Sequence, residues 1–484
     1  MLNICGRSST TCQSAGTGIS RRQLLQAGGT GLLGLNLPAV LAAEDAIPFS
    51  NATAKSVIFL FLFGGPSQLE TFDLKPEAPD TIRGPFKPIA CRTPGLQICE
   101  HLPRTALVSD RCTIIRTMSH SFNDHSGGGH YIQTGQRWHV PVGAGFNVTP
   151  RDWPAMGSVV EFLSQKQSGT ASEIPAYAVL PNSLGRLQEY KVQLRRPGET
   201  AGWLGRGFDP ITTRIDKRDS NDNPYWRSCT DDELTFQIDG LVQHESLTLS
   251  RLDKRRSLLA QFDHARRGLN NHVIDTYDQY QQRALALVTS EKTRQALDLR
   301  NEPASLRDRY GRHLFGQSTL MARRMVEAGA RFVTVHYDCV DGYSWDSHQN
   351  STDVKNHLLP TMDQALAALL EDLEDRGLLD ETLVVCLGEM GRTPKANSNW
   401  GRDHWSTLFP AVLAGGGVRR GLIYGETDAD AAYAVTPPVS PEDLAATIYH
   451  ALGISPEYRI RDTTGRPTPI APGGQPLTDL FLKA

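Results

Sequence analysis

The stretch TLVVCLGEMGR, residues 382–392, contains the clearest evidence for the fold class. Its first six residues form an unbroken, β-favouring run, which is typical of a strand buried on both faces of a parallel sheet. The run stops at Gly388, and polar residues follow at once. Upstream, Met362, Leu366, Leu369, Leu370 and Leu373 fall on one helical face, which predicts a helix that ends at Gly377.

Similar strand and helix patterns occur along the rest of the chain. We predict further strands at residues 57–63, 112–118, 332–335 and 409–414. A helix is expected over 314–329, and another is expected to begin at Ser440 and run to Gly453. Strands that alternate with helices imply right-handed crossovers. The fold class is therefore α/β, with a mainly parallel, doubly wound sheet.

Length and composition are those of a large globular domain. The 484 residues include 50 Lys and Arg against 53 Asp and Glu, a balance that argues against a nucleic-acid-binding protein. We expect one domain over residues 50–484, with a charged, mostly helical insertion at about 209–301. Cys91 and Cys99 flank Pro94-Gly95, so they either close a small disulfide loop or are two buried thiols.

The first 43 residues differ from the rest of the chain. Ser20-Arg21-Arg22-Gln23-Leu24-Leu25 precedes a run rich in Gly and Leu that ends in Ala42-Ala43. This pattern is typical of a twin-arginine signal peptide, and the alternative is an N-terminal membrane anchor. We expect the twin-arginine export machinery as a partner and a periplasmic or extracellular location. No stable membrane span is expected after processing, because no later segment approaches the roughly 20 apolar residues required.

Acidic and histidine side chains collect at the ends of the predicted strands. They are Glu70, Asp73, His120, Asp124, His125, His130, Asp346, His348, Glu389, Asp403 and His404. Residues 119–129 are expected to form a polar, glycine-rich loop after one strand. Open α/β sheets build their sites at such loops. Because carboxylates and imidazoles are ligands for divalent cations, the sequence predicts a metal site for zinc, calcium or magnesium.

Several long motifs resemble a known family. They are FGGPSQLETFD (63–73), HSGGGHYIQTG (125–135), RYGRHLFGQSTLMARRMVEAGARFVTV (309–335), SWDSHQN (344–350), GEMGRTPKANSNWGRDHW (388–405) and VLAGGGVRRG (412–421). Together they span nearly the whole chain after the signal. In these motifs the chain resembles the exported bacterial family called domain of unknown function 1501, which belongs to the alkaline phosphatase and sulfatase superfamily.

This resemblance implies metal-dependent hydrolysis of phosphate or sulfate esters, with an anionic ester as the substrate. A sulfated or phosphorylated glycan is one form of such a substrate. The implied metal ligands are Asp346, His348, Glu389 and His404, and Arg392 would bind an anionic oxygen. Where the superfamily usually has an Asp after the first strand, this chain has Gly64, so that role falls to Glu70 or Asp73. Met390 also stands where the superfamily has a His ligand.

The resemblance leaves two candidates for attack on the ester. Counting back from Thr134-Gly135 places the superfamily's nucleophile at His125, with Ser126 beside it. Ser126 could attack directly. Alternatively, His125 is the missing metal ligand and water attacks, which we favour because this chain lacks a ligand. No Cys lies at this position, which disfavours a sulfatase with a modified cysteine.

The departures from the superfamily pattern also leave a second function open. Gly64 and Met390 favour an exported binding protein on a hydrolase fold that has lost part of its metal site. The acids and histidines that remain favour the enzyme. A structural alternative exists for two arginines as well, since Arg392 and Arg402 could pair with Glu389 and Asp403.

Overall fold

A computed structural model of the chain describes residues 51–145, 147–168, 173–181, 196–216, 218–219, 222–238, 290–337 and 344–482. Contacts divide the chain between Pro48 and Phe49, so all described residues belong to the second of two units. The predicted signal at 1–43, Cys339 and residues 239–289 of the predicted insertion lie outside the described residues. Within those residues, no helix combines the length and the apolar character needed to cross a membrane.

The apolar runs form the central strands of one large sheet. Its strands are β1 (Ser56–Phe61), β4 (Cys112–Met118), β5 (Tyr177–Leu180), β6 (Ile211–Arg214), β7 (Gln237–Ile238), β8 (Phe332–His336), β9 (Thr382–Leu387), β12 (Phe409–Ala414) and β13 (Leu422–Tyr424). Their order is β13-β4-β12-β9-β1-β8-β5-β6-β7. Only β12 and β7 run antiparallel to their neighbours. The prediction of a mainly parallel α/β sheet is therefore confirmed.

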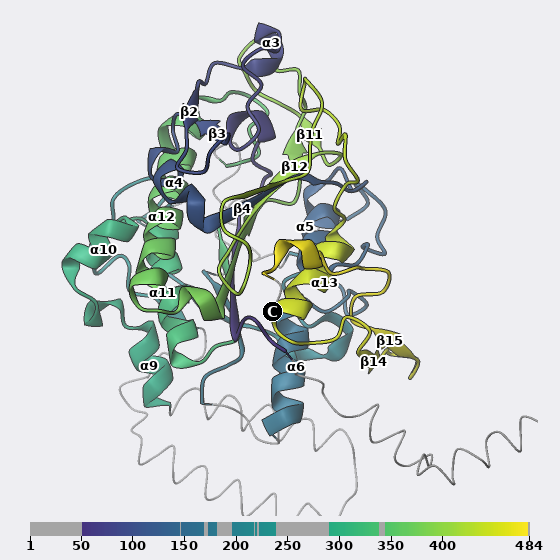
Figure 1. Cartoon of the computed structure of the whole chain (residues 1–484). Coiled ribbons are helices and arrows are strands. Elements are labelled where there is room, and N and C mark those ends of the chain that lie inside the picture. The colour runs from purple at the N-terminus through teal and green to yellow at the C-terminus, as the bar shows by residue number, and fades with distance from the viewer. Residues whose placement is uncertain are drawn as a thin grey trace, which may run out of the picture. The chain divides into compact units, whose positions relative to one another are not determined.

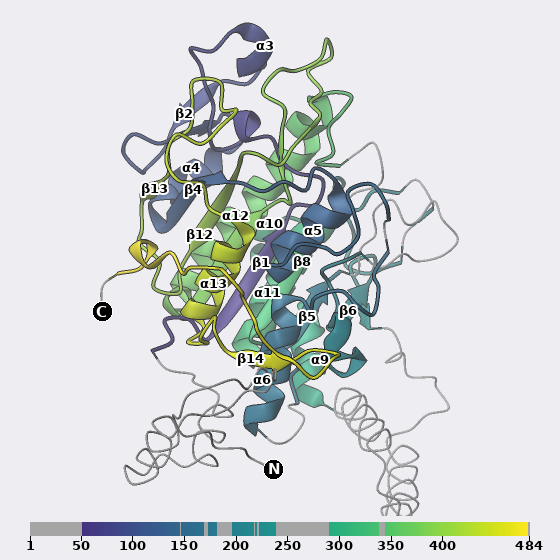
Figure 2. The ribbon, with the colours of Figure 1, turned by 90° about the vertical axis from the view of Figure 1, so that its right-hand side faces the viewer.

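Helices cover both faces of this sheet (Figures 1 and 2). On one face lie α4 (Pro103–Val108), α9 (Glu291–Leu297), α10 (Ala304–Tyr310), α11 (Leu314–Ala328) and α12 (Leu359–Asp375). On the other lie α5 (His125–Thr134), α6 (Met156–Ser168) and α13 (Pro441–Ala451). Smaller elements outside the sheet are α3 (Asp80–Arg83), β2 (Pro88–Ala90), β3 (Gln97–Cys99), β10 (Gly391–Arg392), β11 (His404–Trp405), β14 (Arg459–Arg461) and β15 (Pro467–Pro469).

The predicted helix ends agree with the structure. Helix α11 ends before Gly329, whose φ of 112° allows the left-handed C-terminal turn. Helix α13 begins with a capping box, in which the Ser440 side chain accepts a hydrogen bond from the backbone N–H of Asp443, and the Asp443 carboxylate accepts one from that of Ser440. The local sequence thus determines where these helices start and stop.

The predicted loop at 119–129 is wrong in its second half, because α5 begins at His125. The Asp124 side chain caps this helix by accepting a hydrogen bond from the N–H of Gly127. Three successive glycines disfavour a helix intrinsically. Here they allow close packing, since a Cβ on Gly128 would lie 3.4 Å from Glu389. Tertiary packing against the end of β9 therefore outweighs the low helix propensity.

The described start of the predicted insertion contains β6 and β7, which extend the sheet at one edge. These two short strands were not predicted. Cys91 and Cys99 are both free thiols, so the small disulfide loop does not form, and burial raises the pKa of Cys99 to about 12.

The antiparallel strand β12 has a consequence for the functional site. Because it runs against β4 and β9, its first residue, Phe409, lies at the edge where the parallel strands end. The short hairpin of β10 and β11 comes just before it in the chain and pairs Arg392 with His404. At the carboxyl edge of the sheet, side chains that follow the parallel strands therefore meet side chains that precede the antiparallel strand β12.

Candidate metal centre

Three loops and the short strand β11 bring polar side chains together at the carboxyl edge of the sheet. The loop after β4 leads to His125 at the start of α5, and the segment after β8 contains Asp346 and His348. The loop after β9 contributes Glu389, and β11 contributes His404. The strands β4, β12, β9, β1 and β8 are consecutive in the sheet, so these loops are neighbours.

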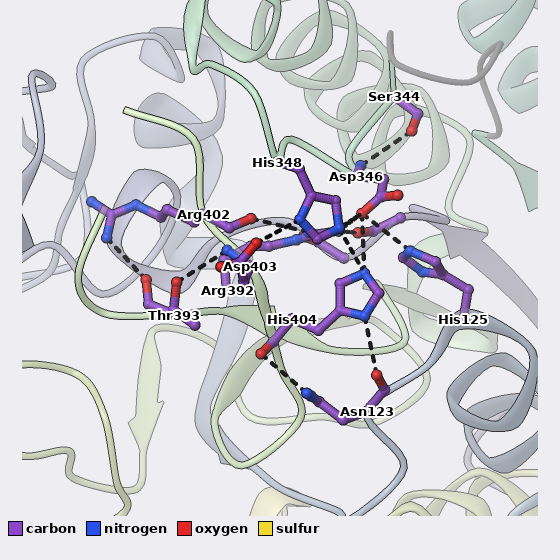
Figure 3. Close-up of polar contacts among 12 residues, drawn as sticks. Asn123, His125, Ser344, Asp346, His348, Arg392, Thr393, Arg402, Asp403 and His404 are labelled. Atoms are coloured by element: carbon purple, nitrogen blue, oxygen red, sulfur yellow. Dashed lines mark hydrogen bonds and ion pairs between the residues drawn. The ribbon is translucent and has the colours of Figure 1, made fainter. Parts of the chain in front are cut away.

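The four side chains of His125, Asp346, His348 and His404 each offer one ligand atom, and these atoms lie within 4.8 Å of one another. They surround one oxygen, Asp346 Oδ1 (Figure 3). The Nε2 atoms of His348, His125 and His404 lie 2.9, 3.1 and 3.2 Å from this oxygen. Their side chains are 17–38% exposed, so the cluster can be reached from solvent.

The other ring nitrogen of each histidine has a hydrogen-bond acceptor. His125 Nδ1 donates to Glu389 Oε1 at 2.5 Å, and His348 Nδ1 donates to Asp403 Oδ1 at 2.8 Å. His404 Nδ1 donates to the main-chain oxygen of Asn123 at 3.0 Å. Ionised carboxylates and carbonyls only accept, so each Nδ1 carries a hydrogen. In the neutral rings all three Nε2 lone pairs therefore face the cluster.

Two of these lone pairs come very close to each other. The Nε2 atoms of His348 and His404 are 2.9 Å apart. Two facing lone pairs repel unless a proton or a cation lies between them. A zinc ion holds each ligand atom at roughly 2 Å, so atoms bound to one ion lie about 3–4 Å apart. Three imidazoles and one carboxylate, each imidazole with a hydrogen-bonded Nδ1, therefore fit a single divalent cation.

The electrostatics of the cluster reflect the same crowding. Burial alone would lower the pKa of His125, but hydrogen bonds to Asp346 and Glu389 outweigh it and raise this pKa to about 9. The hydrogen bond to Asp346 also raises the pKa of His348. Burial opposes ionisation of Asp346, yet contacts with the three histidines hold its pKa well below the usual range. The site thus favours a negative Asp346 with positive charge around it.

Arg392 holds Asp346 in place. Its Nη2 donates to Asp346 Oδ1 at 2.6 Å and also to the Gly64 carbonyl, while Nε and Nη1 donate to the carbonyls of Gly65 and Arg402. Four of its five N–H groups are thereby engaged, and the side chain is fully buried. Arg392 therefore orients a ligand of the cluster, and the contact with an anionic oxygen that the resemblance implied stays a prediction.

The structure separates the remaining predicted site residues from the four-residue cluster. Glu389 contacts His125 Nδ1 and the Gly64 N–H, so it lies behind a ligand. Asp73 is buried in another ion-pair group, with Lys75 Nζ at 3.1 Å and Arg116 Nε at 3.5 Å. Asp73 thus neutralises cations away from the cluster and does not replace the acid missing at position 64.

Two other sequence expectations concern pairing and the nucleophile. Arg402 pairs with buried Glu70, Nε to Oε1 at 3.0 Å, and not with Asp403. Ser126 is 7% exposed in the first turn of α5. Among the described residues, its hydroxyl has no hydrogen-bond partner that could act as a base.

Asn123 and Gly64 contact residues of the cluster in ways that the sequence alone does not predict. Asn123 offers its carbonyl to His404 Nδ1, and its side chain donates to the His404 carbonyl at 3.3 Å. Main-chain contacts of this kind leave no signal in a sequence. Gly64 adopts a φ of 114°, and a Cβ there would lie 2.5 Å from the Asp346 backbone nitrogen. Its signal was the glycine itself, which replaces an expected acid.

The fold and the site together define an α/β protein with a candidate metal centre at the carboxyl edge of its sheet. The family model described as protein of unknown function (DUF1501) matches residues 54–481. The chain belongs to this family. None of the curated proteins matches the sequence.

Solved structures with a similar chain path include two hydrolases. The PsFucS1 sulfatase from Pseudoalteromonas sp. has 13% identity and a TM-score of 0.36, and the match covers 90% of this chain and 72% of that one. The phosphonate monoester hydrolase SpPMH from Silicibacter pomeroyi has 10% identity and a TM-score of 0.34, with 87% and 78% covered. Because these similarities are remote, a function has to be inferred from the side chains of the site.

Proposed function

We propose that this chain is an exported, metal-dependent hydrolase of phosphate or sulfate esters. The observation that carries the proposal is the convergence of three imidazole Nε2 atoms on Asp346 Oδ1, with each Nδ1 bound to an acceptor. Each acceptor behind an Nδ1 fixes the orientation of its ring, as hydrogen-bond partners of metal-binding histidines commonly do. A nitrogen-rich set of this kind favours zinc over calcium or magnesium.

Each residue of the centre has a definite part in this function. His125, Asp346, His348 and His404 would hold the cation, which supplies Lewis-acid polarisation of the ester oxygen and charge stabilisation. Arg392 keeps Asp346 oriented and offsets part of its charge. The partial exposure of His348 leaves the centre open to a substrate from solvent. An anionic ester suits the positive charge that a dication would add.

The test is hydrolysis by the purified mature protein, loaded with zinc, of p-nitrophenyl phosphate, bis-p-nitrophenyl phosphate and p-nitrophenyl sulfate. A panel of sulfated and phosphorylated glycans extends the same assay. We expect turnover of at least one class, with loss on chelation and recovery on zinc addition. His404→Ala should lose the activity. Turnover by the His404→Ala preparation equal to that of the parent would indicate a contaminating hydrolase.

A specific observation supports the competing function of a binding protein. In the described part of the chain, only one group of side chains can hold a metal ion, and the Arg392 donors are largely engaged. If the zinc-loaded protein turns over no ester of the panel but binds inorganic phosphate or sulfate, the binding-protein function is favoured and the hydrolase proposal fails.

A further inference from the structure

Glu389 differs from the other partners of the cluster histidines in how it is held. Its side chain is fully buried, whereas Asp403, the partner of His348, is 80% exposed. The backbone N–H of Gly64 donates to Glu389 Oε1 at 2.9 Å and to Oε2 at 3.1 Å. His120 Nε2 donates to the Glu389 carbonyl at 2.6 Å. Both the carboxylate and the backbone of Glu389 are therefore fixed.

Gly64 explains why the carboxylate can be fixed from this side. The loop after β1 passes so close to Trp345 and Asp346 that a Cβ at position 64 would lie 2.5 Å from the Asp346 nitrogen. With glycine there, the amide reaches Glu389. Helix α5 packs on the same residue, since a Cβ on Gly128 would lie 3.4 Å from the Cγ of Glu389. Glu389 thus lies against two glycine-containing segments, and its carboxylate contacts His125 Nδ1.

The contact between Glu389 and His125 also has an electrostatic effect on the centre. Asp346 and Glu389 bring two carboxylates to the site, and Arg392 brings one fixed cation. A buried carboxylate without compensation is costly. The Glu389 charge acts on the far nitrogen of a ligand ring, where a carboxylate raises the electron-donating strength of Nε2.

We infer that Glu389 is a positioning residue for the metal centre: it holds His125 with Nδ1 protonated and Nε2 facing the cation, and it strengthens His125 as a ligand. Asp403 makes the same hydrogen bond to His348 but contributes little, because solvent can replace it. This inference rests on the metal centre of the proposed function. It assigns Glu389 a place behind the ligands, where the family resemblance implied a ligand.

The test compares Glu389→Gln with the matched control Asp403→Asn, both of which remove one charge with little change in shape. Zinc affinity is measured by competition with a chelating dye, after circular dichroism has verified the fold. We expect Glu389→Gln to bind zinc about 10–100-fold more weakly than the parent, and Asp403→Asn to stay within about threefold. Equal affinities for the parent and Glu389→Gln would overturn the inference.

If the Glu389→Gln protein fails to fold, a second measurement on the parent tests the same inference. In the zinc-loaded parent labelled with ¹⁵N-histidine, we expect the His125 signals of a ring protonated at Nδ1 and bound to zinc through Nε2, assigned with His125→Ala. Zinc on Nδ1 would overturn the inference. If the parent binds zinc as described but hydrolyses no ester, the proposed function fails and the inference stands. A parent that binds no divalent cation would overturn both.

Discussion

Ser126 lies one residue after His125, in the first turn of α5. A serine nucleophile needs a base within hydrogen-bond reach. The described residues provide none for its hydroxyl. We therefore expect Ser126→Ala to keep most of any ester hydrolysis, within about threefold in kcat, since the change removes no activated group.

The control for this prediction is His125→Ala, which should lose both activity and metal because it removes a ligand of the cluster. Steady-state kinetics and metal analysis of the two variants separate the possibilities. Activity abolished in Ser126→Ala with unchanged metal content would restore the serine as the nucleophile.

The sequence was sufficient to predict the four residues of the cluster. It was not sufficient to predict the contacts that Glu389, Asp73 and Arg392 make. The four lie in the segments that follow β4, β8 and β9, and such segments meet at the carboxyl edge of a parallel sheet. Asp73 also follows a strand, yet Lys75 and Arg116 neutralise it elsewhere. Whether a carboxylate binds a cation, an imidazole or an arginine depends on distances of a few ångström between distant segments. A single sequence does not contain this information.

At the scale of elements, α11 depends on an unusual cap. The ring nitrogen Nδ1 of His313 accepts a hydrogen bond from the N–H of Gly316 at 3.1 Å. Burial lowers the pKa of His313 to about 3. In the unfolded chain this histidine titrates near its ordinary pKa of about 6.5. The unfolded state therefore takes up the proton first, and the stabilisation is lost as pH falls below about 6.5.

His313→Asn keeps a capping acceptor but does not titrate. We expect the free energy of unfolding of the parent to fall by about 1 kcal/mol more than that of His313→Asn between pH 7.5 and pH 5.5. Urea unfolding at both pH values measures the difference. The same pH dependence in the two proteins would contradict a neutral, buried His313 cap.

The central strands and the longer helices could be predicted because burial and local periodicity determine them. The bounds of β4, β9 and β12 equal the predicted runs. Helix α5 could not be predicted, since its three glycines favour a helix only through packing against Glu389 and neighbouring side chains. The strands β6 and β7 could not be predicted because they are short and contain polar residues, and β7 lies at the edge of the sheet.

At the scale of the whole molecule, export is the prediction that depends on the N-terminal segment. The twin-arginine route recognises a pair of arginines, here Arg21 and Arg22. The double change Arg21→Lys and Arg22→Lys should leave the protein in the cytoplasm, because lysine does not replace arginine where planar bidentate recognition is required. Cell fractionation with immunoblotting measures this. Normal amounts of the double variant in the periplasm would contradict the twin-arginine assignment.

The sheet topology explains how one molecule can assemble this centre from distant segments. Four parallel strands end at the same edge, and antiparallel β12 begins there, so residues from 123 to 404 meet around Asp346. Loss of one ligand leaves the others in place but under-coordinates the cation. Metal binding is therefore the property on which the whole interpretation depends.

The most direct test is the metal content and zinc affinity of the purified mature protein, measured by inductively coupled plasma mass spectrometry and dye competition beside His404→Ala. His450→Ala, at the end of α13, is the control. We expect about one divalent cation per chain in the parent and in His450→Ala, and an affinity at least about tenfold lower in His404→Ala. A parent that binds no divalent cation, or His404→Ala that binds zinc as tightly as the parent, would contradict the metal centre.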